Sequence, residues 1–172
     1  MNVRAIDAAD AGDVAAYKSV RLRSLSMNPE AFGSTYEREL AFDDVSWRSR
    51  VGGFRGRPGT VFLAQDEIGP TGIAGIGLEN PSEHDGVATA YLWGMWVDPR
   101  ARGNGTSGAL VSACIGWAAA SKVSLVVLDV VRDNSVAIAL YARFGFLPTG
   151  RVGGLASNPC AEELEMCLLV PH

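Results

Sequence analysis

Apolar residues in the first third of the chain recur at helical spacing. Residues 3–7 suit a short strand, after which Asp10 can cap a helix. The apolar side of that helix consists of Val14, Tyr17, Leu22 and Leu25. The Asn28-Pro29 pair interrupts the helix, and a second helical region follows over residues 30–53, where a pair of glycines ends it. This part of the chain is therefore predicted to form one strand and two helical regions.

After residue 60 the pattern changes to short apolar runs separated by turn residues. Three such runs predict an antiparallel meander, at residues 60–66, 72–79 and 87–97. The other expected elements are helices at 105–121 and 135–144 and strands at 123–131, 146–152 and 162–170. Two of the strands, at 87–97 and 123–131, flank a helix as in a βαβ unit. The predicted fold class is α/β of the α+β type, with a mixed and largely antiparallel sheet.

Composition limits the size of the fold and its partners. The chain has 172 residues, of which 48% are hydrophobic, and this suits a single domain over residues 1–172. A net charge of -4 and a pI of about 5.1 give no general basic field, so neither nucleic acid nor an anionic membrane is an expected partner. No apolar run reaches the roughly 20 residues of a membrane span, and the N-terminus lacks a signal-peptide pattern. We expect a cytoplasmic protein.

Cysteine and histidine are sparse. The three cysteines, Cys114, Cys160 and Cys167, have no C-x-x-C spacing and no histidine nearby, so neither a disulfide framework nor a metal site is expected. Only His84, in a polar loop, and the terminal His172 remain, which argues against a histidine-based triad.

A glycine-rich segment at residues 97–111 is predicted to join a strand to a helix. Gly103, Gly105 and Gly108 let the backbone approach a ligand, and the unpaired N–H groups of the following helix favour a phosphate. The same glycines fit the dinucleotide fingerprint, with Asp129 at the distance of a ribose-binding acid. The segment lies past the middle of the chain, however, and too few residues follow Asp129 to complete a doubly wound sheet. We therefore favour a different phosphate ligand.

Two segments together resemble a known family. The sequence VDPRARGNG at 97–105, followed about thirty residues later by NSVAIALYARFGF at 134–146, resembles the acetyl-coenzyme A binding and catalytic motifs of the GNAT superfamily of N-acetyltransferases. The likeness covers residues 60–150, and residues 30–37 also resemble the acceptor-side helices of small bacterial members. It implies a GNAT-like sheet with helices on both faces, acetyl-coenzyme A as co-substrate, no metal, and direct attack by a primary amine in a ternary complex.

The resemblance also implies a coenzyme-binding set. Backbone N–H groups of the glycine loop would bind the pyrophosphate, with Arg102 supplying charge, and the pantothenate arm would pair with the backbone of a splayed strand in which Gly94 marks a bulge. Asn134 matches the residue that hydrogen-bonds the coenzyme arm, and it also suits a helix N-cap. The implied residues are Met95, Trp96, Val97, Arg102, Gly103, Asn104, Gly105, Thr106, Ser107, Gly108 and Asn134. For the side chains of Met95 and Trp96, core packing is the favoured interpretation.

The catalytic residues implied by the resemblance are Tyr141 and Asp129. Tyr141 occupies the position of the family's general acid, and a backbone N–H of Val97 or its neighbour would stabilise the oxyanion. Many members carry a Glu as general base where this sequence has Tyr91. Asp129 is the best replacement, since the matching position of ribosomal-protein alanine acetyltransferases carries a catalytic Glu, and the shorter Asp would act through a water.

Other interpretations of the acidic residues stay open at this point. Asp129 would equally fit a surface carboxylate, or a carboxylate paired with an arginine such as Arg132 or Arg151. Glu37 and Glu39, on the acceptor-side helix, are weaker candidates for the base, and solvated helix charges are the favoured interpretation for both.

The expected activity is transfer of an acetyl group to a primary amine of a small molecule or a peptide. A small amine, an amine-bearing antibiotic and a peptide N-terminus would each fit as the acceptor. The alternative is a non-catalytic acyl-coenzyme A sensor, to which Tyr91 at the usual position of the base lends weight. Several candidate edge strands favour a homodimer.

Overall fold

The computed structural model describes residues 1–171 and begins with a strand and a helical layer. The strand β1 (Asn2–Ala5) is followed by α1 (Ala11–Met27), the 3-10 turn η1 (Pro29–Ala31), α2 (Tyr36–Leu40) and α3 (Asp44–Gly52). The side chain of Asp10 caps α1 by accepting a hydrogen bond from the amide of Asp13. The predicted second helical region is thus three short pieces, because Asn28-Pro29 and the Thr35 and Asp43 caps each restart the chain.

The sheet takes up most of the remaining chain. Its strands are β2 (Gly53–Phe54), β3 (Arg57–Gln65), β4 (Pro70–Leu78), β5 (Thr89–Val97), β6 (Leu125–Val131), β7 (Leu147–Leu155) and β8 (Asn158–Leu169). Two helices, α4 (Thr106–Ala120) and α5 (Ser135–Arg143), and the short turns η2 (Pro81–His84) and η3 (Pro99–Ala101) connect them. The predicted meander, βαβ unit and closing strands are confirmed, with the last hairpin longer than expected and β2 not anticipated.

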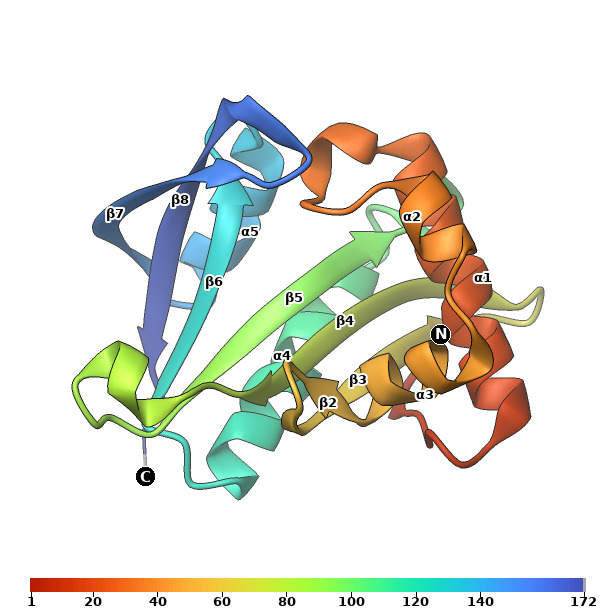
Figure 1. Ribbon diagram of the computed structural model, residues 1–172, viewed down its shortest axis with the longest axis horizontal. Coiled ribbons are helices and arrows are strands. Elements are labelled where there is room, and N and C mark those ends of the chain that lie inside the picture. The colour runs from red at the N-terminus through yellow and green to blue at the C-terminus, as the bar shows by residue number, and fades with distance from the viewer. Residues whose placement is uncertain (172) are drawn as a thin grey trace.

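Strand order is β1-β3-β4-β5-β6-β8-β7, with β2 paired to β3 off this path (Figure 1). Every pair is antiparallel except β5 and β6, which run parallel. These two strands pair only where Thr89–Tyr91 lies beside Leu125–Val127, and beyond this point they diverge. A sheet with a single parallel pair is not doubly wound, so the dinucleotide-binding interpretation of the glycine loop is wrong.

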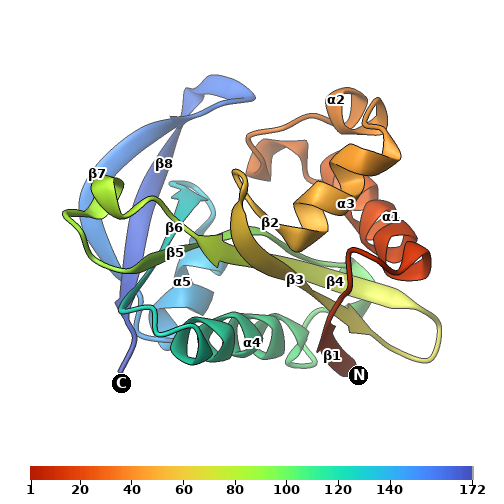
Figure 2. The same ribbon diagram turned by 60° about the horizontal axis from the view of Figure 1, so that its bottom comes forward.

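Helices cover both faces of the sheet (Figure 2). Alternation along β3 sends Val61 and Leu63 into a core with α1 and α3, whereas Ala64 belongs to the core on the α4 and α5 side. Both faces of the sheet are buried, so successive residues of a central strand are apolar on both sides. This accounts for the continuous apolar runs in β4 and β6. Within residues 1–171, no helix is long and apolar enough to cross a membrane.

A bulge in β5 opens the sheet at its centre. Ile73 of β4 is opposite Trp96 and Gly75 is opposite Trp93, so β5 holds one extra residue between these pairs. Gly94 lies there with a φ of 62°, a left-handed conformation that costs a side chain energy. The predicted bulge at Gly94 is confirmed, and it coincides with the separation of β5 from β6.

Candidate active site

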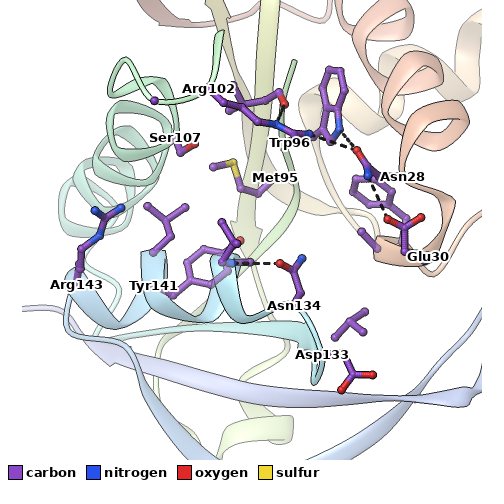
Figure 3. Close-up of a pocket in the computed structure, with 18 residues that line it drawn as sticks. Asn28, Glu30, Met95, Trp96, Arg102, Ser107, Asp133, Asn134, Tyr141 and Arg143 are labelled. Atoms are coloured by element: carbon purple, nitrogen blue, oxygen red, sulfur yellow. Dashed lines mark hydrogen bonds between the residues drawn. The ribbon is translucent and has the colours of Figure 1, made fainter. Parts of the chain in front are cut away.

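The gap between β5 and β6 holds a cavity of about 610 Å³ (Figure 3). Its walls come from β5, from the turn that precedes α4, from α5, and from the segment after α1. Eight of the predicted site residues line it: Met95, Trp96, Val97, Arg102, Gly103, Ser107, Asn134 and Tyr141. The divergence of the two strands therefore brings together residues that lie far apart in the sequence.

The glycine loop presents unused backbone donors at this cavity. Gly103 and Gly105 have φ values of 78° and 87°, and a Cβ at either position would meet nothing within 4 Å. Among the described residues, no acceptor is found for the amides of Gly103, Asn104, Gly105, Ser107 and Gly108, while the amide of Thr106 donates to Oδ1 of Asn104. Free amides at the positive end of a 15-residue helix form a suitable cradle for a pyrophosphate.

The residues of this loop differ in whether they line the cavity. Gly103 and Ser107 do, whereas Asn104, Gly105, Thr106 and Gly108 do not. The hydroxyl of Thr106 is turned inward, toward Asn104 and the sulfur of Met1. Any role of these four residues therefore depends on backbone groups.

Two arginines stand on the walls of this cavity. Nε of Arg102 donates to the carbonyl of Val97 at 3.0 Å, and Arg143 extends from the last turn of α5 (Figure 3). Arg143 was not singled out from the sequence, although it lies two residues after Tyr141 in the recognised motif. Both arginines carry charge that a phosphate-bearing ligand requires.

One edge of β5 is free along the cavity. The amide of Asp98 donates to the carbonyl of Thr71 on β4, so strand alternation turns the backbone of Val97 to the opposite side. There the carbonyl of Val97 accepts from Arg102, and its amide has no strand partner because β6 has diverged. An extended ligand can add to this edge as a further strand.

Tyr141 lies at the junction of two cavities. Its side chain is 6% exposed and packs edge-to-face on Phe146, with ring centroids 5.7 Å apart. Burial raises the pKa of the Tyr141 hydroxyl, so the phenol stays protonated. Asn134, whose Oδ1 caps α5 by accepting from the amide of Ala137, also borders both cavities.

The second cavity, of about 330 Å³, lies on the other side of the gap. It is enclosed by the N-terminal helices, β5, β6 and β8, and it shares Met95, Asn134 and Tyr141 with the first. The hydroxyl of Ser157, at the turn of the β7–β8 hairpin, donates to the carbonyl of Phe32 and joins the hairpin to the segment after α1. We call these the coenzyme-side cavity and the acceptor-side cavity.

Asp129 lines the acceptor-side cavity and accepts a hydrogen bond of 2.8 Å from the hydroxyl of Tyr91. The suggested pairing with Arg132 or Arg151 is wrong, because these arginines contact Glu162 and Glu165 instead. Tyr91 occupies the position where many family members carry the base, and Asp129 is its suggested replacement. The two residues are thus direct neighbours across β5 and β6.

Glu163 of β8 is a third polar group here and was not anticipated. It lines the same cavity, and burial together with the charge of Asp129 raises the pKa of its carboxyl. Its place in the last strand, outside the recognised motifs, left no local signal in the sequence.

Glu39 differs most from expectation. It is fully buried, and both Arg21 and Arg50 donate to it, so neither a solvated charge nor a general base describes it. Burial alone would raise the pKa of the Glu39 carboxyl, but the hydrogen bonds and charge of Arg21, with the charge of Arg50, hold it below its usual range. Glu37 is exposed, as expected.

Comparison with known proteins agrees with this geometry. The model of the acetyltransferase (GNAT) family matches residues 22–146, more than two thirds of the chain. The chain belongs to the GNAT acetyltransferase family. Within the described residues, no group of three or more His, Cys, Asp or Glu side chains is placed to hold a metal ion.

Curated relatives and solved structures extend this result. A mycothiol acetyltransferase of Kocuria rhizophila is 31% identical over 140 residues, covering 78% of this chain and 42% of the relative, and that of Beutenbergia cavernae is 31% identical over 125 residues, covering 72% and 40%. The chain thus spans about two fifths of the length of these relatives.

Among solved GNAT structures, a putative acetyltransferase from Salmonella typhimurium with its cofactor acetyl-CoA superposes with a TM-score of 0.75 at 20% identity, covering 100% of this chain and 95% of that one. The ribosomal-protein-S18-alanine N-acetyltransferase of Escherichia coli superposes with a TM-score of 0.66 at 17% identity, covering 99% and 94%. These similarities establish the GNAT fold.

Proposed function

We propose that this chain transfers an acetyl group from acetyl-coenzyme A to a primary amine. One observation supports the proposal above others: two cavities on opposite sides of one strand gap share Met95, Asn134 and Tyr141. A donor in one cavity and an acceptor in the other can therefore meet without leaving the protein. Such an arrangement suits direct transfer in a ternary complex.

The coenzyme-side cavity has the groups that the donor needs. The free amides of Gly103, Asn104, Gly105, Ser107 and Gly108 would bind the pyrophosphate. Arg102 and Arg143 would add charge. The pantetheine arm would lie along the free edge of β5 at Met95–Val97, which aims the thioester at the shared wall. Asn134, at the start of α5, stands beside that path.

The reaction requires an uncharged amine, a site for the oxyanion and a proton for the leaving group. The amine nitrogen attacks the thioester carbonyl carbon, a C–N bond forms and the C–S bond then breaks. We assign the oxyanion to the amide of Val97 and the proton donor to Tyr141, whose raised pKa keeps the phenol intact for donation to the thiolate. Coenzyme A and the acetamide are the products.

Asp129 is assigned as the group that accepts the proton from the amine. It opens on the acceptor-side cavity, and the Tyr91 hydroxyl fixes its Oδ2 at 2.8 Å. A water between the carboxylate and the amine would complete the path, since the Asp side chain is short. Tyr91 is a positioning residue in this scheme.

Two measurements test the proposal. Acetyl-coenzyme A, but not NAD, should raise the melting temperature, because a ligand that binds only the folded state stabilises it. Release of coenzyme A thiol on a panel of amines should then fall by about 10²-fold or more in Tyr141→Phe, with little change in coenzyme affinity. Tight binding of acetyl-coenzyme A without turnover of any amine would instead support the sensor function.

A further inference from the structure

The acceptor-side cavity has walls of opposite charge. Asp129 and Glu163, on β6 and β8, provide carboxylates on one side. Arg21 of α1 and Arg50 of α3 provide guanidinium groups on the other. A third arginine, Arg55, lines the cavity over the ring of Tyr91 and is paired with Glu79 at 3.8 Å. A ligand with a single charge would satisfy only one of these walls.

The positively charged wall is not neutralised within the protein. Glu39 accepts from Nε and Nη2 of Arg21 at 2.9 and 2.8 Å, and from Nη2 of Arg50 at 3.2 Å. Two guanidinium groups therefore share one carboxylate, and the cluster keeps a net positive charge, with Arg21 and Glu39 buried and the Arg50 side chain 31% exposed. Burying such a charge is unfavourable unless an anion or a set of acceptors accompanies it.

Two donors of this cluster are left over, Nη1 of Arg21 and Nε of Arg50, which have no hydrogen-bond partner among the described residues. Nη1 of Arg21 belongs to the more deeply buried of the two residues, since Arg21 is only 4% exposed. Its direction is fixed, because the other two nitrogens bind Glu39 and the guanidinium carbon lies 4.7 Å from the centre of the Phe32 ring. A buried, charged donor without a partner is rare in proteins and calls for an acceptor.

The position of this donor relates it to the reaction. A Cβ added to Gly94 would lie 3.7 Å from Nη1 of Arg21, so the donor stands beside the β5 bulge. Met95, the next residue, borders both cavities at the place where the thioester is expected. A ligand atom that accepts a hydrogen bond from Nη1 of Arg21 would thus be only a few bonds away from the attacking nitrogen of the same ligand.

We propose that the acceptor is a small amino carboxylate, with its carboxylate on Nη1 of Arg21 and its amine toward Asp129 and Glu163. This inference rests on the proposed acetyl transfer and specifies its substrate class. The cavity of about 330 Å³ matches a small molecule, and each charge of the ligand meets the opposite charge of the protein. Burial and, after it, the charge of Asp129 raise the pKa of Glu163, and an ammonium group beside both carboxylates relieves their repulsion.

Matched acceptors test this with the unmodified protein. Thiol release from acetyl-coenzyme A is measured with the common α-amino acids, each beside its carboxamide and its decarboxylated amine, and with short peptides. We expect kcat/KM for the best amino acid to exceed that of its carboxamide by about tenfold to a hundredfold, the loss that follows when a charged donor stays unpaired. Equal rates, or a preference for peptides or simple amines, would overturn the inference and leave the transferase function intact. Absence of turnover with every amine, despite binding of acetyl-coenzyme A, would overturn both.

Variants of Arg21 test whether this residue causes the preference for a carboxylate. Arg21→Lys keeps a cation opposite Glu39 but lacks the third nitrogen, so the preference for the carboxylate should fall to less than about threefold while turnover of the carboxamide persists. Arg48→Lys is the matched control, because Arg48 of α3 donates to the carbonyl of Ala8, outside the cavity, and the preference should be unchanged. If Arg21→Lys fails to fold, the comparison of each amino acid with its carboxamide on the unmodified protein decides the inference. An undiminished preference in a folded variant would remove Arg21 from the site.

Discussion

At the scale of single residues, the hydrogen bond between Tyr91 and Asp129 explains how a tyrosine can occupy the usual position of a base. The hydroxyl of Tyr91 holds the carboxylate that stands across the strand gap, so the two positions work as a pair. Burial, with the charge of Asp129, raises the pKa of Tyr91, which keeps the phenol a donor. The proposed proton acceptor, Asp129, thus lies on the strand next to Tyr91 and lines the same cavity.

Asp129→Asn should lower kcat, and most strongly at acidic pH. The amide cannot accept a proton, and at low pH a larger fraction of the amine substrate is protonated, so the variant needs the missing base most there. A loss of about 10²-fold in kcat near pH 6, with an unchanged Kd for acetyl-coenzyme A, is the expected result. Kinetics equal to those of the unmodified protein across this range would transfer the role to another carboxylate or to water.

Glu163→Gln should raise stability at neutral pH. Because the folded-state pKa of Glu163 is raised, its stabilising contribution is complete below the ordinary value of 4.5 and is lost as the pH rises through the folded value. Gln stays neutral, so the melting temperature of the variant should exceed that of the unmodified protein by about 1–3 °C at pH 7.5 and match it near pH 4. A variant less stable at pH 7.5 would show that the ionised carboxylate has a favourable partner. The same variant should bind an amine more weakly.

At the scale of elements, the start of α4 is the feature on which the proposed donor site depends. Gly105 has a φ of 87°, and its conformation directs the amides of the first helical turn outward. Gly105→Ala should cost about 1 kcal/mol of folding stability and raise the Kd for acetyl-coenzyme A several-fold, as measured by calorimetry.

Gly116 provides the control within the same helix. It lies in the interior of α4, and a Cβ there would meet nothing within 4 Å. Gly116→Ala should therefore stabilise the protein by about 0.5–1 kcal/mol and leave the Kd unchanged. Equal effects of the two substitutions on the Kd would mean that the amides of the first turn do not bind the coenzyme.

The sequence predicted the elements well where local patterns determine them. The strands of the meander, α4, α5 and the bulge at Gly94 follow from alternation, caps and glycine positions, and all are present. The family and fold were likewise recognisable from residues 97–105 and 134–146. The assigned roles of Tyr141, Asp129 and the loop amides remain predictions.

What local patterns cannot supply is long-range charge pairing. Glu39 looked like an ordinary helix charge, because its partners, Arg21 and Arg50, lie on two other helices. Glu163 and Arg21 likewise reach the acceptor-side cavity only through the tertiary fold. The donor half of the site therefore followed from motifs, whereas the acceptor half required the structure.

At the scale of the whole molecule, the Arg21–Glu39–Arg50 cluster ties α1, α2 and α3 into one layer over the sheet. Glu39→Gln should destabilise the protein by about 3–5 kcal/mol in urea unfolding, because it leaves two guanidinium groups without their carboxylate. Glu37→Gln, on the exposed side of the same short helix, should change stability by less than about 0.5 kcal/mol.

Acidic pH should reduce the difference in unfolding free energy between the unmodified protein and Glu39→Gln. The folded-state pKa of Glu39 is lowered, so its contribution is present above about pH 4.5 and is lost as the pH falls toward the folded value. The unmodified protein and Glu39→Gln should consequently approach each other in stability near pH 3. A gap that stays constant with pH would show that the ionised form of Glu39 is not what stabilises the helical layer.

The unoccupied main-chain donors at the glycine loop have an evolutionary corollary. Recognition through peptide groups is indifferent to side-chain identity, so substitutions at Asn104 or Thr106 that preserve the turn would leave coenzyme binding unchanged. In the proposed function, the acceptor-side cavity would recognise its ligand through side chains, and a single substitution at Arg21 or Glu163 would alter its charge pattern. A duplicated gene could retain its acetyl donor and acquire a new acceptor by altering very few codons.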